Sequence, residues 1–274
     1  MPDPMVIFSL FLVLCAAGAI AGIISGLLGV GGGIILVPAF YYAFNGLGFH
    51  PDQLMQICVA TSTGTIIVTS LRSVTSHFKR GAVSLELILD WGPFVALGSI
   101  LGVLAAASLR SQQLQLVFGG IGVSLGLYML LGKRSWRISE ALPGRILSAV
   151  YGTLIGFFSA LMGIGGGSFT VPLLTAYNVP PHRAVGTSPG FGLMIAVPGF
   201  ITFLLTGWGL PDKPPFTVGY VNLPAVALIM AMSVVTVPIG VALAHRLSPA
   251  RLRLVFALTV LILAGNMLRK ALMG

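Results

Sequence analysis

The chain has 274 residues, of which 56% are hydrophobic and only 8% are charged, and its mean hydropathy is +1.01. A soluble domain carries about a quarter charged residues, so this composition excludes a soluble nucleotide-binding enzyme, a nucleic-acid module and a secreted disulfide scaffold. The net charge of +9 comes from basic residues between apolar runs, where membrane topology explains them without nucleic acid as a partner. The sequence therefore predicts an all-α polytopic membrane protein embedded in a lipid bilayer.

Hydrophobic elements follow one another along the whole chain, and most are long enough to cross a bilayer core, which needs about 20 apolar residues per helix. The elements 33–45 and 168–178 are too short, because about 13 and 11 residues span only roughly 15 to 20 Å as a helix. We expect each to form, with the end of the preceding helix, a bent re-entrant hairpin that turns at glycines. The expected elements are 5–28, 33–45, 54–75, 84–109, 114–132, 146–162, 168–178, 184–206, 218–244 and 254–272.

The two halves of the chain repeat each other in sequence. Residues 29–33 read Gly-Val-Gly-Gly-Gly and residues 163–167 read Gly-Ile-Gly-Gly-Gly, and a proline follows each pentad after the same interval. Downstream, Val-Ala-Thr-Ser at 59–62 corresponds to Val-Gly-Thr-Ser at 185–188. This ordered set of matches indicates a duplication.

The duplication divides the single membrane domain into a first repeat, 1–132, a linker, 133–145, and a second repeat, 146–274. A re-entrant hairpin adds either two crossings or none, so each repeat makes an odd number of crossings and the second is inverted. With the linker in the cytoplasm, eleven Lys and Arg residues fall inside and four outside, as the positive-inside rule favours. We expect both termini to lie outside.

Inverted repeats with a short, glycine-interrupted element at corresponding places point to a transporter site near the bilayer midplane. Consecutive glycines permit positive φ and close backbone approach, and the helix that follows offers free N–H groups and a positive dipole end to an anion. The competing interpretation is that the glycines only allow tight helix packing. The candidate residues of the two loops are Gly31, Gly32, Gly33, Gly165, Gly166, Gly167 and the added hydroxyl Ser168.

Hydroxyl side chains form the next candidate group, because they can coordinate an oxyanion without bringing a charge into lipid. They lie in two clusters related by the repeat. Their alternative role is to bond the carbonyl four residues earlier in the same helix, as Ser and Thr often do in membranes. The candidates are Thr61, Ser62, Thr63, Thr187 and Ser188.

Two further residues, Arg72 and His77, are candidates for steering an anion at the cytoplasmic entrance. Arg72 can instead snorkel to the interface, and His77 can instead be a solvated loop residue. Acidic residues are absent from the middle of the apolar runs, which disfavours a carboxylate proton relay. Cys15 and Cys58 lack metal or redox spacing, so no metal site and no cofactor are expected.

At these motifs the chain resembles the sulfite exporter TauE/SafE family of prokaryotic membrane permeases. The resemblance rests on the two Gly-x-Gly-Gly-Gly pentads, the Ala-Thr-Ser and Gly-Thr-Ser that follow them, and His-Phe-Lys-Arg-Gly at 77–81. The second half has Pro-Asp-Lys-Pro-Pro at 211–215 near the place of this last motif, so the histidine has no counterpart there. The family implies transport of small sulfur-containing anions, such as sulfite, sulfoacetate or related organosulfonates.

The resulting hypothesis is a secondary permease or exporter in the prokaryotic inner or plasma membrane. It would carry a small anion by alternating access about a midplane site between the repeats. The alternatives are a membrane-embedded enzyme, which would need Ser168 and a histidine as nucleophile and base, and a structural membrane subunit, which needs no polar site. The apolar runs contain no His-Glu-x-x-His motif and no aspartate pair, so we expect no enzyme.

Overall fold

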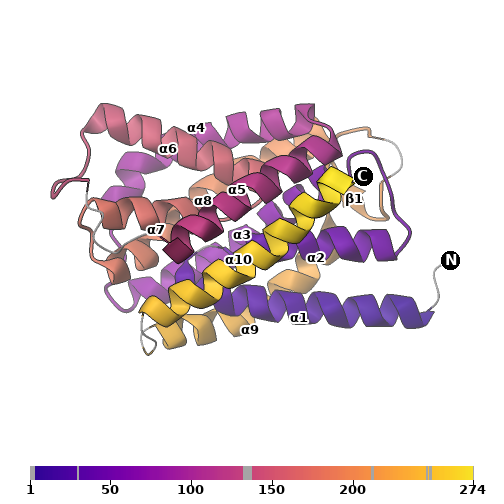
Figure 1. Cartoon of the computed structure of the whole chain (residues 1–274), viewed down its shortest axis with the longest axis horizontal. Coiled ribbons are helices and arrows are strands. Elements are labelled where there is room, and N and C mark those ends of the chain that lie inside the picture. The colour runs from indigo at the N-terminus through magenta and orange to yellow at the C-terminus, as the bar shows by residue number, and fades with distance from the viewer. Residues whose placement is uncertain are drawn as a thin grey trace.

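The computed structural model describes residues 4–29, 31–131, 138–210, 213–244, 246 and 249–273. Within these residues the chain forms an α-helical bundle with one small β-hairpin (Figure 1), which confirms the all-α polytopic class. The first half contains α1 (Pro4–Leu28), α2 (Gly33–Gly46), α3 (Leu54–Phe78), α4 (Leu85–Ser108) and α5 (Ser111–Leu131). The second half contains α6 (Arg145–Met162), α7 (Gly167–Ala176), α8 (Pro181–Thr206), β1 (Thr217–Val218), β2 (Val221–Asn222), α9 (Leu223–Ala244) and α10 (Pro249–Met273).

The lengths of the helices agree with the sequence prediction. Seven helices of the described chain are long and apolar enough to cross a membrane. In contrast, α2 has 14 residues and α7 has 10, as expected for elements that do not span. Helices α8 and α10 begin a few residues earlier than predicted, because the prediction stopped at basic residues, whereas a helix continues past the hydrocarbon into the interface.

The short helices return to the end of the bundle from which the preceding helix came (Figure 1). Helix α1 starts at the end where α10 finishes, which we call the terminal end, and α2 runs back towards it. Helix α6 starts at the opposite end, where α5 finishes, which we call the linker end, and α7 runs back there. Of the predicted linker 133–145, residues 133–137 lie outside the described residues. Each hairpin therefore turns within the bundle.

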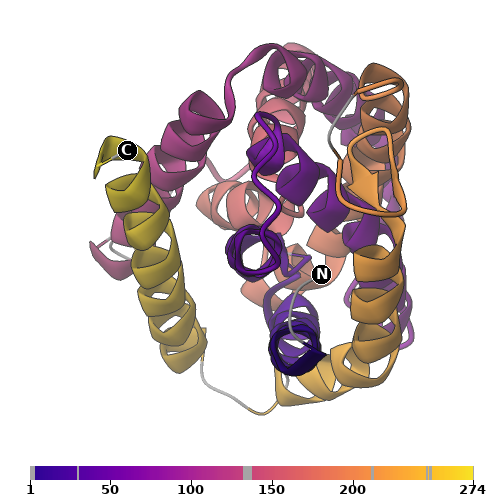
Figure 2. The same ribbon diagram turned by 90° about the vertical axis from the view of Figure 1, so that its right-hand side faces the viewer.

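The long helices pair across the two halves of the sequence (Figures 1 and 2). Helix α1 packs along α9, and its counterpart α6 packs along α4. Helix α3 also contacts α2 and α9, while α8 contacts α7 and α4. We call α1, α2, α3 and α9 the first unit and α4, α6, α7 and α8 the second unit. The two units meet mainly where α3 packs against α8, and α5 and α10 pack together beside them.

Glycines bring the paired helices into backbone contact. A Cβ placed on Gly26 would overlap the backbone carbonyl of Val237 in α9, and a Cβ on Gly156 would overlap that of Val95 in α4. Small residues provide close packing in a membrane, where the hydrophobic effect does not drive helices together. Each unit is therefore held by a tight contact between one helix from each half.

A β-hairpin replaces the first turn of one predicted element. The apolar run 218–244 was expected to be continuous, whereas α9 begins at Leu223, after the two-stranded β1–β2 pair. Gly219 makes the turn with φ 57°, and the Asn222 side chain accepts a hydrogen bond from the N–H of Ala225 at 3.1 Å. The amide cap satisfies an N–H at the start of α9, which fixes where the helix begins.

Candidate functional site

The first glycine loop connects α1 to α2 through residues in the left-handed region. Gly29, Gly31 and Gly32 have φ of 67°, 80° and 77°. A side chain would be strained at each of these angles, so the loop depends on glycine. The second loop differs: Gly163 ends α6 with φ 60°, but Gly166 precedes α7 with φ −58°. Among the candidate glycines, the expectation of positive φ is therefore correct for Gly31 and Gly32 and wrong for Gly166.

The two glycine loops contact each other inside the bundle. A Cβ placed on Gly31 would lie 3.0 Å from the Cα of Gly165. A Cβ on Gly33 would overlap the carbonyl oxygen of Gly163 and lie 2.8 Å from the Cα of Ile164. Space at the contact, as well as φ, therefore requires glycine. This contact brings together the turns of the two hairpins, which enter from opposite ends of the bundle.

Two of the predicted hydroxyls join the units at this contact. Ser62 Oγ of α3 donates to the carbonyl of Gly163 at 2.7 Å. Ser188 Oγ of α8 donates to the carbonyl of Gly29 at 3.2 Å and shares this proton with the carbonyl of Val185 in its own helix at 3.0 Å. Ser62 and Ser188 occupy equivalent positions in the repeats, and so do the two glycines. Each unit therefore supplies a donor to a loop carbonyl of the other, where an unpaired carbonyl would be costly in the membrane.

The predicted threonines make contacts within the units. Thr61 Oγ1 accepts from the N–H of Asn222 at 3.1 Å, and its counterpart Thr187 Oγ1 accepts from the N–H of Ser84 at 2.9 Å. These contacts attach α3 to the start of α9 and α8 to the start of α4. Thr63 Oγ1 instead donates to the carbonyl four residues earlier at 2.9 Å, so the alternative role is confirmed for this residue.

Additional donors from α3 satisfy carbonyls of the first hairpin. Ser73 Oγ lies 3.5 Å from the carbonyl of Ser25, and Thr69 Oγ1 lies 3.3 Å from that of Gly31. His77 Nε2 lies 3.2 Å from the carbonyl of Gly26; because a carbonyl only accepts, Nε2 is the donor. The last carbonyls of a helix have no partner within that helix. This side-chain layer was not predicted, although the spacing of 69, 73 and 77 along one helix face could have indicated it.

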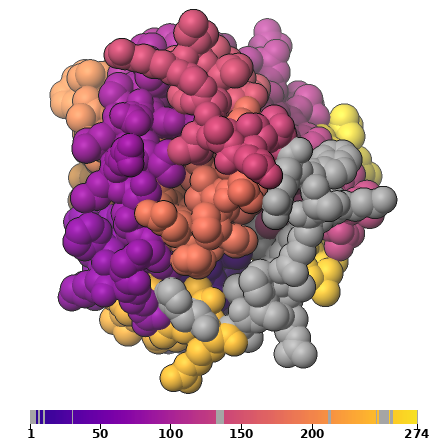
Figure 3. Space-filling view, turned by 90° about the vertical axis from the view of Figure 1, so that its left-hand side faces the viewer, coloured from indigo at the N-terminus to yellow at the C-terminus, as the bar shows by residue number. Residues whose placement is uncertain are grey.

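The two candidate steering residues occupy different environments. His77 is only 1% exposed, so the solvated alternative is wrong. Arg72 is exposed, and its guanidinium donates to the carbonyl of Val234 in α9 at 3.3 Å. Among the side chains whose burial is described, His77 is buried, but every Asp, Glu, Lys and Arg is at least partly accessible. Charged side chains are therefore excluded from the buried core of the described structure, whose linker end faces the viewer in Figure 3.

Ser168, the hydroxyl that is present only in the second loop, lies in the first turn of α7. It is 2% exposed, and its Oγ has no hydrogen-bond partner within the described structure. Thr170 Oγ1, in the same turn, is fully buried and is likewise unpartnered. Sequence reasoning singled out Ser168 but not Thr170, although the repeat alignment places Thr170 opposite Leu36 in the same way that it places Ser168 opposite Ile34.

A polar recess lies at the terminal end, away from the glycine loops. It has a volume of about 540 Å³ and is lined by the α2–α3 loop and Lys213. His50 in this loop forms a 2.8 Å hydrogen bond with the side-chain oxygen of Asn45. Within the described residues, no group of three or more His, Cys, Asp and Glu side chains is arranged to hold a metal ion.

Comparison with known proteins gives the relationship of the whole chain. The family model for the sulfite exporter TauE/SafE matches residues 14–267. The chain belongs to the TauE/SafE family. It is 32% identical to a probable membrane transporter protein of Haemophilus influenzae, over 95% of this chain and 99% of that protein.

More distant relatives of this TauE/SafE chain have the same description. A probable membrane transporter protein of Methanocaldococcus jannaschii is 28% identical over 89% of the chain and 90% of that protein. One from Bacillus subtilis is 27% identical over 72% of the chain and 79% of that protein. No solved structure matches the chain. The family and the apolar helices together identify a multi-pass membrane transporter.

Proposed function

We propose that this TauE/SafE protein is a secondary permease for a small sulfur oxyanion, such as sulfite or the sulfonate group of sulfoacetate. The observation that supports this most directly is the contact between the two glycine loops, at which α2 and α7 both begin. A pair of short helices that start inside the membrane is the arrangement by which transporters present positive dipole ends to an anionic substrate. The proposed binding region comprises both glycine loops and the hydroxyls of α3, α7 and α8.

An anion is the favoured substrate because of what surrounds the loops. Backbone N–H groups and hydroxyls donate hydrogen bonds to an oxyanion. The described interior has no buried carboxylate that would repel it and no Lys or Arg that would hold it permanently. Arg72, at the linker end, can instead raise the local concentration of the anion through long-range attraction.

The transport cycle that we propose alternates access to the loop contact from the two ends of the bundle. The tight helix pairs α1–α9 and α4–α6 favour motion of the first unit against the second, rather than of one sequence half against the other. The serine bonds from Ser62 and Ser188 cross between these units and would be remade during the cycle. The proposed orientation keeps the linker end in the cytoplasm and both termini outside, in accord with the basic residues.

Uptake into proteoliposomes tests the proposal. Purified protein should accumulate radiolabelled sulfite or sulfoacetate inside vesicles in a saturable manner, and protein-free vesicles should not. The labelled anion should be recovered chemically unchanged, which separates a permease from a membrane enzyme. Absence of uptake of both anions, with correctly inserted protein, would contradict the proposed substrate class and favour a structural subunit or another transported solute.

A further inference from the structure

The two hairpins differ in how their buried hydroxyls are used. Hydroxyls in membrane helices usually bond a carbonyl of the preceding turn, as Thr175 and Thr202 do here at 2.9 and 2.8 Å. Ser168 and Thr170 are buried in the first turn of α7 and make no such bond within the described structure. A buried hydroxyl without a partner costs free energy, so two in one helical turn need an explanation.

The hydroxyl of Thr170 points towards the start of α7. Its Oγ1 lies 3.4 Å from the position that a Cβ on Gly166 would occupy, and Gly166 is the residue that precedes the helix. Side chains in helices lean towards the N-terminus, which accounts for this direction. The N–H groups of Phe169 and Thr170 bond the carbonyl of Gly166 at 3.2 and 2.8 Å.

The N–H groups of Gly167 and Ser168 precede these bonded groups, so they have no acceptor within the helix. Hydroxyl and backbone donors are therefore concentrated at one helix end.

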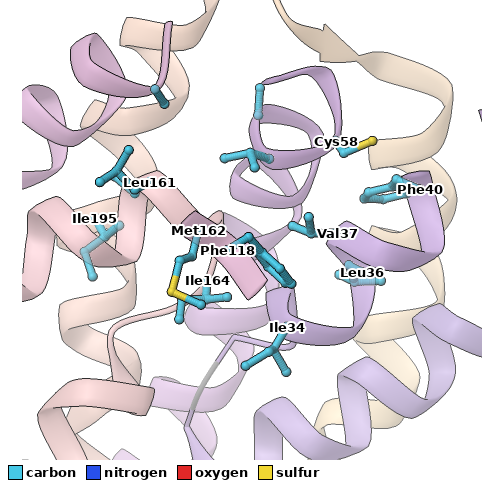
Figure 4. Packing of buried hydrophobic residues seen from close by; sticks show 14 of the residues in the cluster. Ile34, Leu36, Val37, Phe40, Cys58, Phe118, Leu161, Met162, Ile164 and Ile195 are labelled. Atoms are coloured by element: carbon cyan, nitrogen blue, oxygen red, sulfur yellow. The ribbon is translucent and has the colours of Figure 1, made fainter. Parts of the chain in front are cut away.

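The corresponding turn of the first hairpin is apolar. The repeat alignment places Ile34 and Leu36 opposite the two hydroxyl residues, and both are fully buried. In Figure 4 they belong to a hydrophobic cluster that also includes Phe118, Met162 and Ile164. The start of α2 therefore has dipole and backbone donors but lacks side-chain donors of its own in its first turn.

The first hairpin is also attached more firmly by side chains. Four side chains donate hydrogen bonds to carbonyls in the last turn of α1 and in the loop that follows it, namely those of Thr69, Ser73, His77 and Ser188. Of the described side chains, Ser62 is the one that donates to a carbonyl of the second loop. The carbonyls of the first hairpin are thus bonded by several side chains, whereas the second hairpin has two unpartnered hydroxyls in the first turn of its short helix in the described structure.

We infer that the anion is held asymmetrically, by the start of α7, with Ser168 and Thr170 as its side-chain donors and the N–H groups of Gly167 and Ser168 as its backbone donors. The ligand that fits is a compact oxyanion group with three acceptor oxygens, such as sulfite or a sulfonate. This inference rests on the proposed function, and it assigns specificity to residues of one repeat.

The test is equilibrium binding of sulfite and of sulfoacetate to purified protein by titration calorimetry. Ser168→Ala and Thr170→Val each remove one donor to a charged ligand, which should weaken binding by about 10- to 150-fold. Thr170→Ser, which keeps the hydroxyl, should restore most of the affinity. The matched control is Ser25→Ala, because Ser25 is also fully buried and its Oγ is also unpartnered in the described structure, but it lies in the first hairpin. Affinity should stay within about twofold of wild type in this control, since no donor to the ligand is lost.

The outcomes separate this inference from the function on which it rests. Wild-type binding that persists unchanged in both α7 variants overturns the asymmetric site and leaves the permease proposal standing. An equal loss in Ser25→Ala also overturns it, since the effect would then not depend on α7. Wild-type protein that binds neither anion overturns the proposed substrate class and this site with it. Size-exclusion profiles and thermal unfolding temperatures establish that each variant is folded.

Discussion

At the scale of single residues, Gly32 in the first glycine loop is required for two reasons, a positive φ and a close contact with α1. Gly32 has φ 77°, and a Cβ there would lie 2.8 Å from the carbonyl oxygen of Ala21. Gly48 has nearly the same angle, φ 80°, but nothing lies within 4 Å of its Cβ position. The pair therefore separates the cost of the backbone angle from the cost of steric overlap.

Gly32→Ala should consequently destabilise the protein more than Gly48→Ala. Both changes incur the left-handed backbone penalty of about 1 to 2 kcal/mol, and Gly32→Ala adds an overpacking cost of about 1 to 3 kcal/mol. Thermal unfolding in detergent measures the difference. Equal unfolding temperatures for the two variants would show that the loop relaxes around a side chain, and that close approach is not what requires glycine.

The hydrogen bond from Ser62, which joins the two units, should also contribute measurably to stability. Ser62→Ala leaves the carbonyl of Gly163 without its 2.7 Å donor in the membrane interior, at a cost of about 1 to 2 kcal/mol. Thr63→Val is the control, because Thr63 bonds a carbonyl of its own helix. Unfolding in mild denaturant compares them, and a larger loss for Thr63→Val would argue against a bond that links the units.

At the scale of elements, the sequence was sufficient to predict the helices and both short hairpins, because charge-free runs and glycine pentads are local signals. It was not sufficient to predict the β1–β2 hairpin before α9, where Gly219 interrupts an apolar run without any change in hydropathy. For the candidate site, too, the sequence predicted some features and not others. Ser62 and Ser188 were found through the repeat, but their carbonyl partners lie in the other half and depend on tertiary packing.

Helix packing within a unit can be tested at Gly156 of α6, where this helix contacts α4. A Cβ on Gly156 would overlap the backbone of Val95 in α4, whereas a Cβ on Gly120 in α5 has nothing within 4 Å. Gly156→Val should therefore separate α6 from α4 and strongly lower the unfolding temperature, while Gly120→Val should have little effect. Similar behaviour of the two variants would contradict the close α4–α6 packing.

At the scale of the whole molecule, the inverted arrangement makes a prediction about sidedness. Ser139, after the undescribed part of the linker, and Ser108, at the end of α4, are both exposed. With Cys15 and Cys58 replaced by alanine, Ser139→Cys should react with an impermeant maleimide only from the cytoplasm, and Ser108→Cys only from outside. Labelling of both from the same side would exclude the inversion that the basic residues predict.

The division into two units that exchange helices predicts which contacts must move during transport. A Cβ on Gly22 of α1 would lie 3.3 Å from the Cβ of Thr236 in α9, within the first unit. A Cβ on Gly192 of α8 would lie 3.3 Å from the Cβ of Ser70 in α3, across the two units. Both pairs are therefore close enough for an engineered disulfide, for which the Cβ atoms lie about 3.5 to 4.5 Å apart after slight adjustment.

In the alanine background for the native cysteines, oxidation of the Gly192→Cys, Ser70→Cys pair should abolish proteoliposome uptake, and a reductant should restore it. Oxidation of the Gly22→Cys, Thr236→Cys pair should leave uptake close to its reduced level, because α1 and α9 move together. Loss of uptake on oxidation of both pairs would mean that the sequence halves, rather than the exchanged units, move as rigid bodies, because each pair joins the two halves. Mass spectrometry of the oxidised protein verifies that each disulfide has formed before uptake is compared.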